Sequence, residues 1–214
     1  PSQQQLIAEV PATEDPQLST LNPPPSTLHA PLSLGDRYIV STLKSGLVII
    51  DQQRAHERIL FEELMQRKES AVPAGAQQLL FPVNLTFSAA DAELLREMLP
   101  DLRRLGFAME PLGNTAFVVT ATPPQVKESE LQSLFDQMTL DYKGQMMQRF
   151  SDRDRIVCLS LARQMAVKPG THLQPEEVQH ILATLFSCQS PELSPSGKKI
   201  IYLLSEREIE TKLA

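Results

Sequence analysis

The 214-residue sequence contains no tryptophan, and aromatic residues make up only 5% of it. This scarcity disfavours a base-stacking surface, because such surfaces are built from aromatic rings. Only two cysteines occur, Cys158 and Cys188, which argues against a secreted disulfide scaffold. No apolar run approaches the roughly 20 residues that span a bilayer, and no charged-then-apolar leader opens the chain. We therefore predict a soluble protein of the reducing cytoplasm that has no membrane partner.

Basic residues are also in the minority. Twenty Lys and Arg stand against 26 Asp and Glu, so the formal net charge is −6. The chain as a whole does not attract DNA, since nucleic-acid domains usually carry a basic face, and any DNA contact has to be local. With 42% hydrophobic residues, the chain is long enough to bury one large core or two small ones.

The first 31 residues have a composition of their own. They hold seven of the 17 prolines, three acidic residues and no lysine or arginine. So little apolar surface cannot offset the entropy lost on ordering, which predicts a disordered proline-rich linker over residues 1–31. Because the chain opens without methionine, we expect a fragment with a further domain upstream.

The next segment predicts a hairpin that leads into a helix. Two runs rich in β-branched residues, 38–43 and 46–50, flank a Lys-Ser-Gly turn. Asp51 follows directly, where its carboxylate can cap a helix that runs to about residue 68 with apolar pairs at spacing four.

The rest of the chain predicts an inserted unit, after which the chain returns to the first lobe. Residues 71–149 carry strand and helix signals in the order β-α-β-β-α, with Ser88 as a helix cap. After residue 150 come two helices, a strand and a terminal helix entered through a capping box, Ser205 and Glu208. We predict a two-lobed α/β (α+β) fold, in which residues 32–70 and 150–214 form a discontinuous dimerisation lobe and residues 71–149 an inserted regulatory lobe.

The segment Asp51 to Glu62, DQQRAHERILFE, concentrates polar groups at the start of the first helix. Gln53 and Glu57 share a helix face at spacing four, which is the geometry that a pair of metal ligands needs. Taken alone, the residues favour a plainer interpretation: a capped helix N-terminus with solvated or paired charges.

The same segment resembles the D-Q-H-A-x-x-E-x-x-x-x-E signature of the C-terminal domain of MutL-family DNA mismatch-repair proteins. It matches that signature at Asp51, Gln52, Glu57 and Glu62. The flanking residues 38–59 also resemble bacterial members, and the similarity continues to the C-terminus. The resemblance implies a dimerisation and docking domain and, in nuclease-competent members, a metal site that nicks DNA.

The chain departs from the nuclease pattern at several positions. Gln53 replaces the histidine of the signature, and Arg54 replaces its alanine. Cys158 matches a helix cysteine of the family, but Ser194 and Ser196 replace the cysteine and histidine of its C-P-H-G-R-P-like segment. An amide and two hydroxyls are poor substitutes for zinc ligands, so we predict a degenerate endonuclease site.

Four candidate metal ligands remain: Asp51, Glu57, Glu62 and Cys158. Of these, Asp51 and Glu57 would be catalytic in an active nuclease. The carboxylates could hold Mg²⁺ or Mn²⁺, and the thiolate suits Zn²⁺. In the alternative hypothesis, a divergent metal-dependent DNA-nicking endonuclease, His56 supplies the lost imidazole. The structural alternative makes Asp51 a cap, pairs Glu57 with a neighbouring arginine and buries Cys158 in the core.

A second motif, QQLLFP, resembles the Q-x-x-L-x-P clamp-binding peptide of bacterial relatives. Its key positions are Gln77, Leu80 and Pro82. An extended peptide of this kind offers an amide for hydrogen bonds and apolar side chains for a groove on a sliding clamp. The structural alternative is the lead-in to a strand predicted over residues 82–87.

Basic residues gather near the return from the inserted unit and could contact DNA phosphates locally; they are Lys143, Arg149, Arg153, Arg155, Arg163 and Lys168. An equal alternative is a solvated face, because aspartates are interleaved with them. There is no glycine-rich phosphate loop, and in the resembled family ATP is bound by a separate N-terminal domain.

The leading hypothesis is therefore a C-terminal dimerisation and partner-docking domain of a MutL-like mismatch-repair protein. Its expected partners are a second copy of itself, a MutS-like mismatch sensor and a sliding clamp, with DNA bound weakly or through the full-length protein. The nuclease is the second hypothesis. A clamp-tethering module that does not dimerise is the third.

Overall fold

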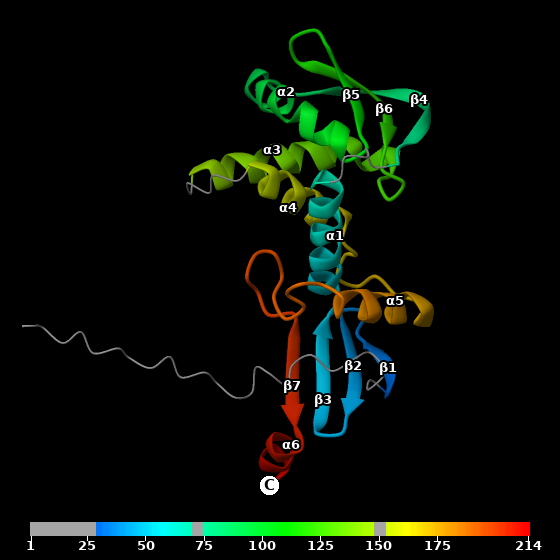
Figure 1. Cartoon of the computed structure of the whole chain (residues 1–214), viewed down its shortest axis with the longest axis vertical. Helices are drawn as coiled ribbons and strands as arrows, with labels where there is room; N and C mark the ends of the chain where they lie inside the picture. Colours follow the sequence, from blue (N-terminus) through cyan, green and yellow to red (C-terminus); the bar gives the residue numbers. More distant parts are fainter. Residues whose placement is uncertain (1–28, 70–74, 148–152) are drawn as a thin grey trace, which may run out of the picture.

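A computed structural model of the chain describes residues 29–69, 75–147 and 153–214. Figure 1 shows two lobes at the two ends of helix α1 (Gln52–Glu69), which runs along the long axis of the molecule. We call them the lower and upper lobes, as they are drawn there. Within the described residues, no helix is long and apolar enough to cross a membrane.

The lower lobe is built on a four-stranded antiparallel sheet. Its strand order is β1-β2-β3-β7, and its strands are β1 (His29–Leu34), β2 (Tyr38–Leu43), β3 (Gly46–Asp51) and β7 (Ile201–Ser205). One face packs on α1 and α5 (Pro175–Leu185), and its core includes Ile39, Val48, Ile50 and Ile201. The chain ends in helix α6 (Glu206–Leu213), which buries none of its residues.

The upper lobe is built on a three-stranded antiparallel sheet. Its order is β4-β6-β5, and its strands are β4 (Gln77–Thr86), β6 (Ala116–Thr122) and β5 (Ala108–Leu112). Its helices are α2 (Ala89–Arg104), the short 3₁₀ turn η3 (Glu128–Glu130), α3 (Leu131–Met147) and α4 (Arg153–Met165). Leu85, Phe117 and Val119 of the sheet share a core with these helices.

Helix α1 contributes to the cores of both lobes. Ala55 and Ile59, in its first half, lie in the lower core, whereas Leu60, Phe61 and Leu64 lie in the upper one. Helix α4 belongs to the upper core through Ile156 to Ala162, although it follows the segment predicted as the insertion. The domain division at residues 70 and 150 remains a prediction, and the hydrophobic cores place α4 with residues 75–147.

Several local predictions are confirmed. The hairpin forms between the two predicted strands, with its turn at Lys44 and Ser45. The cap hydrogen bonds form at Asp51, Ser88 and Ser205, the last as a complete capping box with Glu208. The α+β class and the β-α-β-β-α order of the upper lobe are as expected.

Two boundaries were predicted wrongly. Strand β1 begins at His29, so the last three residues of the predicted linker belong to this strand, and residues 1–28 lie outside the described part. Strand β4 begins at Gln77, five residues before the predicted strand, because a bulge between Gln78 and Val83 lets it pair with β6 on both sides of Pro82. Proline is tolerated at such a bulge because no ladder hydrogen bond is required there.

Candidate functional site

The first candidate residue, Asp51, ends β3 and starts α1. Its Oδ1 accepts a hydrogen bond from the Arg54 backbone N–H at 3.0 Å, and its Oδ2 lies 3.4 Å from the Arg54 Nε. The buried Gln52 side chain donates from Nε2 to the Thr171 carbonyl at 2.9 Å. Both carboxylate oxygens of Asp51 are therefore engaged by its own helix, as the capping interpretation predicts.

Glu57 lies on a different side of α1 and faces α4. Its Oε1 is 3.4 Å from the Nε of Arg163. Burial raises the pKa of the Glu57 carboxyl, and the nearby charges of Arg163, Lys198 and Arg58 oppose that rise. This carboxylate is therefore surrounded by the protein's own cations.

Glu62 lies further along the same helix and is held by two contacts. Its Oε1 lies 3.5 Å from the Arg58 Nη1, and its Oε2 accepts the Gln189 backbone N–H at 2.8 Å. The neighbouring Cys188 thiol has its pKa raised to about 12, first by burial and then by the negative charge of Glu62. At neutral pH Cys188 is thus a neutral thiol and not a metal-binding thiolate.

Cys158 and His56 lie in different surroundings. Cys158 is fully buried in the upper core. His56 accepts the backbone N–H of Val167 at its Nδ1, at 3.1 Å, and burial followed by the nearby His180 lowers the pKa of the His56 imidazole. The imidazole is therefore committed to the end of α4, and it does not replace the histidine missing at Gln53.

The candidate ligands on α1 are spread along the helix. Asp51 and Glu62 are eleven residues apart on α1, which corresponds to about 16 Å along a helix and is too far for both to bind one ion. Nowhere in the described ranges do three or more His, Cys, Asp or Glu side chains come together as a possible metal site. An arginine lies beside one carboxylate oxygen of each of Asp51, Glu57 and Glu62.

The segment 193–199, which holds the two serines predicted to replace metal ligands, closes on itself. The buried Ser194 Oγ accepts the Lys198 N–H at 3.1 Å and lies 3.0 Å from the Ser196 Oγ. The Ser194 N–H donates to the Lys198 carbonyl at 2.8 Å, and Gly197 makes the turn with φ 79°. The serine hydroxyls act as internal bonds of a tight loop.

The predicted clamp peptide lies on β4, at the edge of the upper sheet. Leu80 and Phe81 project from the bulge with 84% and 72% of their surface exposed, and Gln77 and Pro82 are exposed too. Large apolar side chains this exposed are uncommon on a folded surface unless a partner covers them. The residues Gln77, Leu80 and Pro82 are therefore accessible on this edge strand.

The predicted basic patch is largely paired within the chain. Lys143 contacts Asp91, Arg163 contacts Glu57 and Asp141, and Lys168 donates to two backbone carbonyls. Arg149 and the side chain of Arg153 lie outside what the structure describes. The described cations are thus partly neutralised before any phosphate could approach.

The outer face of the lower sheet was not predicted as a functional site. Residues paired directly across antiparallel strands point to the same face, and Leu32, Val40, Ile49 and Tyr202 form one such row across all four strands. Leu32 is 68% and Tyr202 49% exposed. The unbroken apolar run 47–50 was the available signal, since strands apolar on both faces are usually covered on both.

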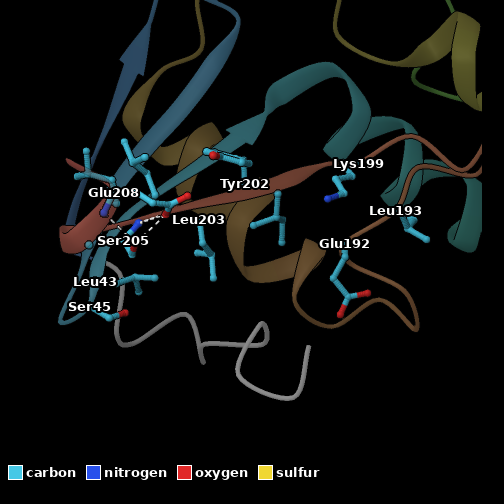
Figure 2. A pocket seen from close by; sticks show the side chains of 13 residues that line it. Leu43, Ser45, Glu192, Leu193, Lys199, Tyr202, Leu203, Ser205 and Glu208 are labelled. Atoms are coloured by element: carbon cyan, nitrogen blue, oxygen red, sulfur yellow. Dashed lines mark hydrogen bonds between the residues drawn. The ribbon is translucent and has the colours of Figure 1, made fainter. Parts of the chain in front are cut away.

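A groove of about 780 Å³ adjoins this face along β7, the edge strand. Leu43, Leu203 and Tyr202 lie along it, and Glu192, Leu193 and Lys199 of the C-terminal loop form one end (Figure 2). Glu208 of α6 stands at the opposite end. The groove therefore runs beside the edge strand from the C-terminal loop to the terminal helix, and of the apolar row only Tyr202 borders it.

Comparison with known proteins gives this surface a family context. The family model described as MutL C terminal dimerisation domain matches residues 33–173. The chain is 38% identical over 178 residues to the DNA mismatch repair protein MutL of Christiangramia forsetii, covering 83% of the chain and 29% of that relative. Against the protein of the same name from Parabacteroides distasonis it is 37% identical over 181 residues, covering 82% and 28%.

The chain thus spans less than a third of the length of these curated relatives. The family model covers well over half of the chain, including β2, β3, α1 and the whole upper lobe. The chain belongs to the family of MutL C-terminal dimerisation domains.

Proposed function

We propose that the chain forms a homodimer through the outer face of its four-stranded sheet and so joins two copies of a DNA mismatch-repair protein. The observation that carries this proposal is the row Leu32, Val40, Ile49 and Tyr202, which is apolar on every strand and has no covering element among the described residues. A second copy is the occupant that a dimerisation-domain family favours. A two-fold axis would place the same row of each protomer against the other.

Dimerisation would serve the longer protein by tethering. Two upstream domains attached to one dimer experience a high effective concentration of each other, without any new contact between them. We expect this arrangement to operate in the cytoplasm together with a MutS-like mismatch sensor. The proposal assigns the described chain a mechanical role in which it holds the partners of the reaction together.

The first experiment is sedimentation equilibrium of the chain, combined with hydrogen exchange. We expect a mass of about twice 23.9 kDa and, on dilution into the monomer range, faster exchange in β1 and β7 than in the upper sheet. A monomer at micromolar concentration contradicts the proposal. A dimer whose lower sheet exchanges at the monomer rate would place the interface elsewhere.

We propose further that the site around Asp51 and Glu57 does not cleave DNA. This rests on the arginine contacts of Asp51, Glu57 and Glu62 and on the commitment of His56 to Val167. Supercoiled DNA incubated with the chain, Mn²⁺ and a sliding clamp should remain uncut, and so should DNA incubated with Asp51→Asn under the same conditions. Nicking that Asp51→Asn abolishes would establish the alternative, a divergent endonuclease.

A second candidate function is docking of a sliding clamp through the β4 peptide. The exposed Leu80 and Phe81 support it, because their side chains stand clear of the upper core. Replacing both by alanine should weaken binding to a clamp about tenfold or more without changing the mass of the dimer. The matched control is Leu112→Ala on β5, which is 55% exposed in the same sheet. Equal affinity of the three proteins would refute this docking site.

A further inference from the structure

Arginines of α1 tie the C-terminal loop, residues 193–199, to the helix. Arg58 donates from Nε to the Leu193 carbonyl at 2.7 Å, and Arg54 donates from Nη1 to the Lys199 carbonyl at 2.7 Å. The same two guanidinium groups pair with Glu62 and Asp51. Each arginine therefore joins one carboxylate of the helix to one end of the loop.

We propose that these guanidinium groups perform the structural task of a bridging metal ion, so that the loop keeps its conformation without any divalent cation. A metal ion would hold the helix and the loop together because it is a cation that binds carboxylate and carbonyl oxygens at once. A guanidinium does the same with several N–H donors in a rigid planar fork. It also occupies those oxygens permanently.

The spacing along α1 supports this assignment. Positions 51, 54, 58 and 62 follow one another at steps of three, four and four residues, which keeps them on one face of a helix. Their charges run negative, positive, positive, negative. Two cations thus lie between two anions that are too far apart to bind a common ion, and the side chains of Arg54, Arg58 and Glu62 contact residues 189–199.

The middle of the loop is held in the same way. Arg155 of α4 donates from Nη2 to the Pro195 carbonyl at 3.3 Å, and its guanidinium lies 5.1 Å from the centre of the Phe61 ring. The loop therefore has an arginine donor at its start, centre and end. Three separate donors fix a seven-residue loop more completely than its single isolated bridge, between Leu193 and Lys199, could do alone.

The substituted serines match this arrangement. A serine hydroxyl can accept one backbone N–H and bond to a second hydroxyl in the same loop, as Ser194 does with Lys198 and Ser196. A buried serine left without such bonds would destabilise the fold. The departures from the family pattern at Arg54, Ser194 and Ser196 thus form one connected hydrogen-bonded unit.

The contacts of Arg54 and Arg58 with the loop also position one end of the groove beside β7. Leu193 and Lys199, whose carbonyls accept hydrogen bonds from the two arginines, line that groove. In this respect the inference rests on the proposed dimer, because an ordered loop would present Leu193 to the second copy. The attachment of the loop to α1 does not depend on the dimer.

The test is residue-resolved hydrogen exchange of the full chain, measured with EDTA, Mn²⁺ or Zn²⁺. We expect the Gly197 and Lys198 amides to keep the same protection, within about twofold, under all three conditions. In Arg58→Met, which keeps most of the aliphatic stem, their protection should fall about tenfold or more, since a hydrogen bond to a charged group is lost. Arg54→Met should lower the protection of the same amides to a similar degree. Because the Arg54 side chain is 35% exposed, its replacement should disturb folding less.

Arg96→Met is the matched control. Arg96 joins Glu93 to the carbonyls of Gly113 and Asn114 in the upper lobe, so its removal should loosen that turn and leave residues 193–199 unchanged. Protection of the loop that collapses in EDTA, or that survives in both Arg54→Met and Arg58→Met, would overturn the inference. Sedimentation of the same variants separates this result from failure of the dimer.

Discussion

The two sheets of the molecule differ on their outer faces. Each sheet packs its inner face on helices, but a row of directly paired residues on the outer face of the upper sheet reads Asn84, Val118 and Glu110. The corresponding row of the lower sheet is apolar on all four strands. An antiparallel sheet with one face in water alternates apolar and polar residues. Only the upper sheet obeys that rule.

This difference suits the outer face of the upper sheet to solvent and the outer face of the lower sheet to contact with a partner. The upper sheet has the polar Asn84 and Glu110 in its outer row, and its most exposed apolar side chains, Leu80 and Phe81, lie at the β4 bulge, where they suit a narrow peptide groove. The lower sheet presents a broad apolar face next to a groove and an unburied helix. The two lobes are therefore suited to different kinds of partner.

The largest expected effect comes from a charge at the centre of the apolar row. Ile49 pairs with Val40 on one side and Tyr202 on the other. Ile49→Asp would bury an unpaired carboxylate in the dimer, so we expect at least a hundredfold weaker dimerisation, about 2.7 kcal/mol, by sedimentation equilibrium. Val118→Asp, at the centre of the upper-sheet row between Asn84 and Glu110, should leave the dimer intact. Equal effects of the two variants would remove the distinction between the faces.

The next effect tests how closely the strands approach in the lower sheet. Gly46 has φ +144°, and a Cβ there would lie 2.1 Å from the Leu204 carbonyl oxygen on β7. Gly46→Ala should therefore lower the free energy of unfolding by on the order of 3 kcal/mol in urea denaturation. Gly113→Ala, in the upper turn, meets nothing within 4 Å and should cost only about 1–2 kcal/mol for its positive φ. Reversed magnitudes would contradict the packing of β7 on β3.

A smaller effect compares two capped helices. Ser88 caps α2, which buries four residues, whereas Ser205 caps α6, which buries none. Ser88→Ala should reduce global stability by about 1 kcal/mol, as loss of a cap typically does. Ser205→Ala should instead speed exchange of the α6 amides alone in the monomer. If it lowers the dimer affinity as well, α6 belongs to the interface, which would extend the contrast between the lobes.

The smallest expected effect is a dependence on pH at the α2 cap. Contacts with Lys143 and then with Ser88 lower the pKa of the Asp91 carboxyl below its usual value of 3.8. A carboxyl whose pKa is lower in the folded state contributes stability above its unfolded pKa, and that stability is lost as the pH falls through the folded pKa. Lys143→Met should therefore flatten the acid limb of an unfolding curve below about pH 4. An unchanged limb would mean that this contact adds no stability.

The local elements could be predicted because their signals are short in sequence. Asp51, Ser88 and Ser205 precede their helices directly, and each accepts a backbone hydrogen bond three residues ahead. The bulge in β4 could not be predicted in this way, because it depends on pairing with β6 some forty residues later. The early start of β1 likewise depends on β2, which supplies its hydrogen bonds.

The candidate site was predictable as a set of residues but not as an arrangement. The sequence showed that Gln53, Ser194 and Ser196 are poor metal ligands. It did not show that Arg58 reaches the Leu193 carbonyl, 135 residues away, or that Arg163 pairs with Glu57 across two helices. Such contacts depend on how α1, α4 and the loop pack, and spacing along the chain does not encode that packing.

By itself, the sequence determined the composition of the faces: an apolar row for the lower sheet, charges in the order − + + − along α1, and a family signature that is broken at its histidine. The tertiary structure decided which face stays uncovered and which carboxylate each arginine meets. The physical reason is range. Caps, turns and periodicity act within a few residues, whereas burial and ion pairing depend on elements that the chain brings together only when it folds.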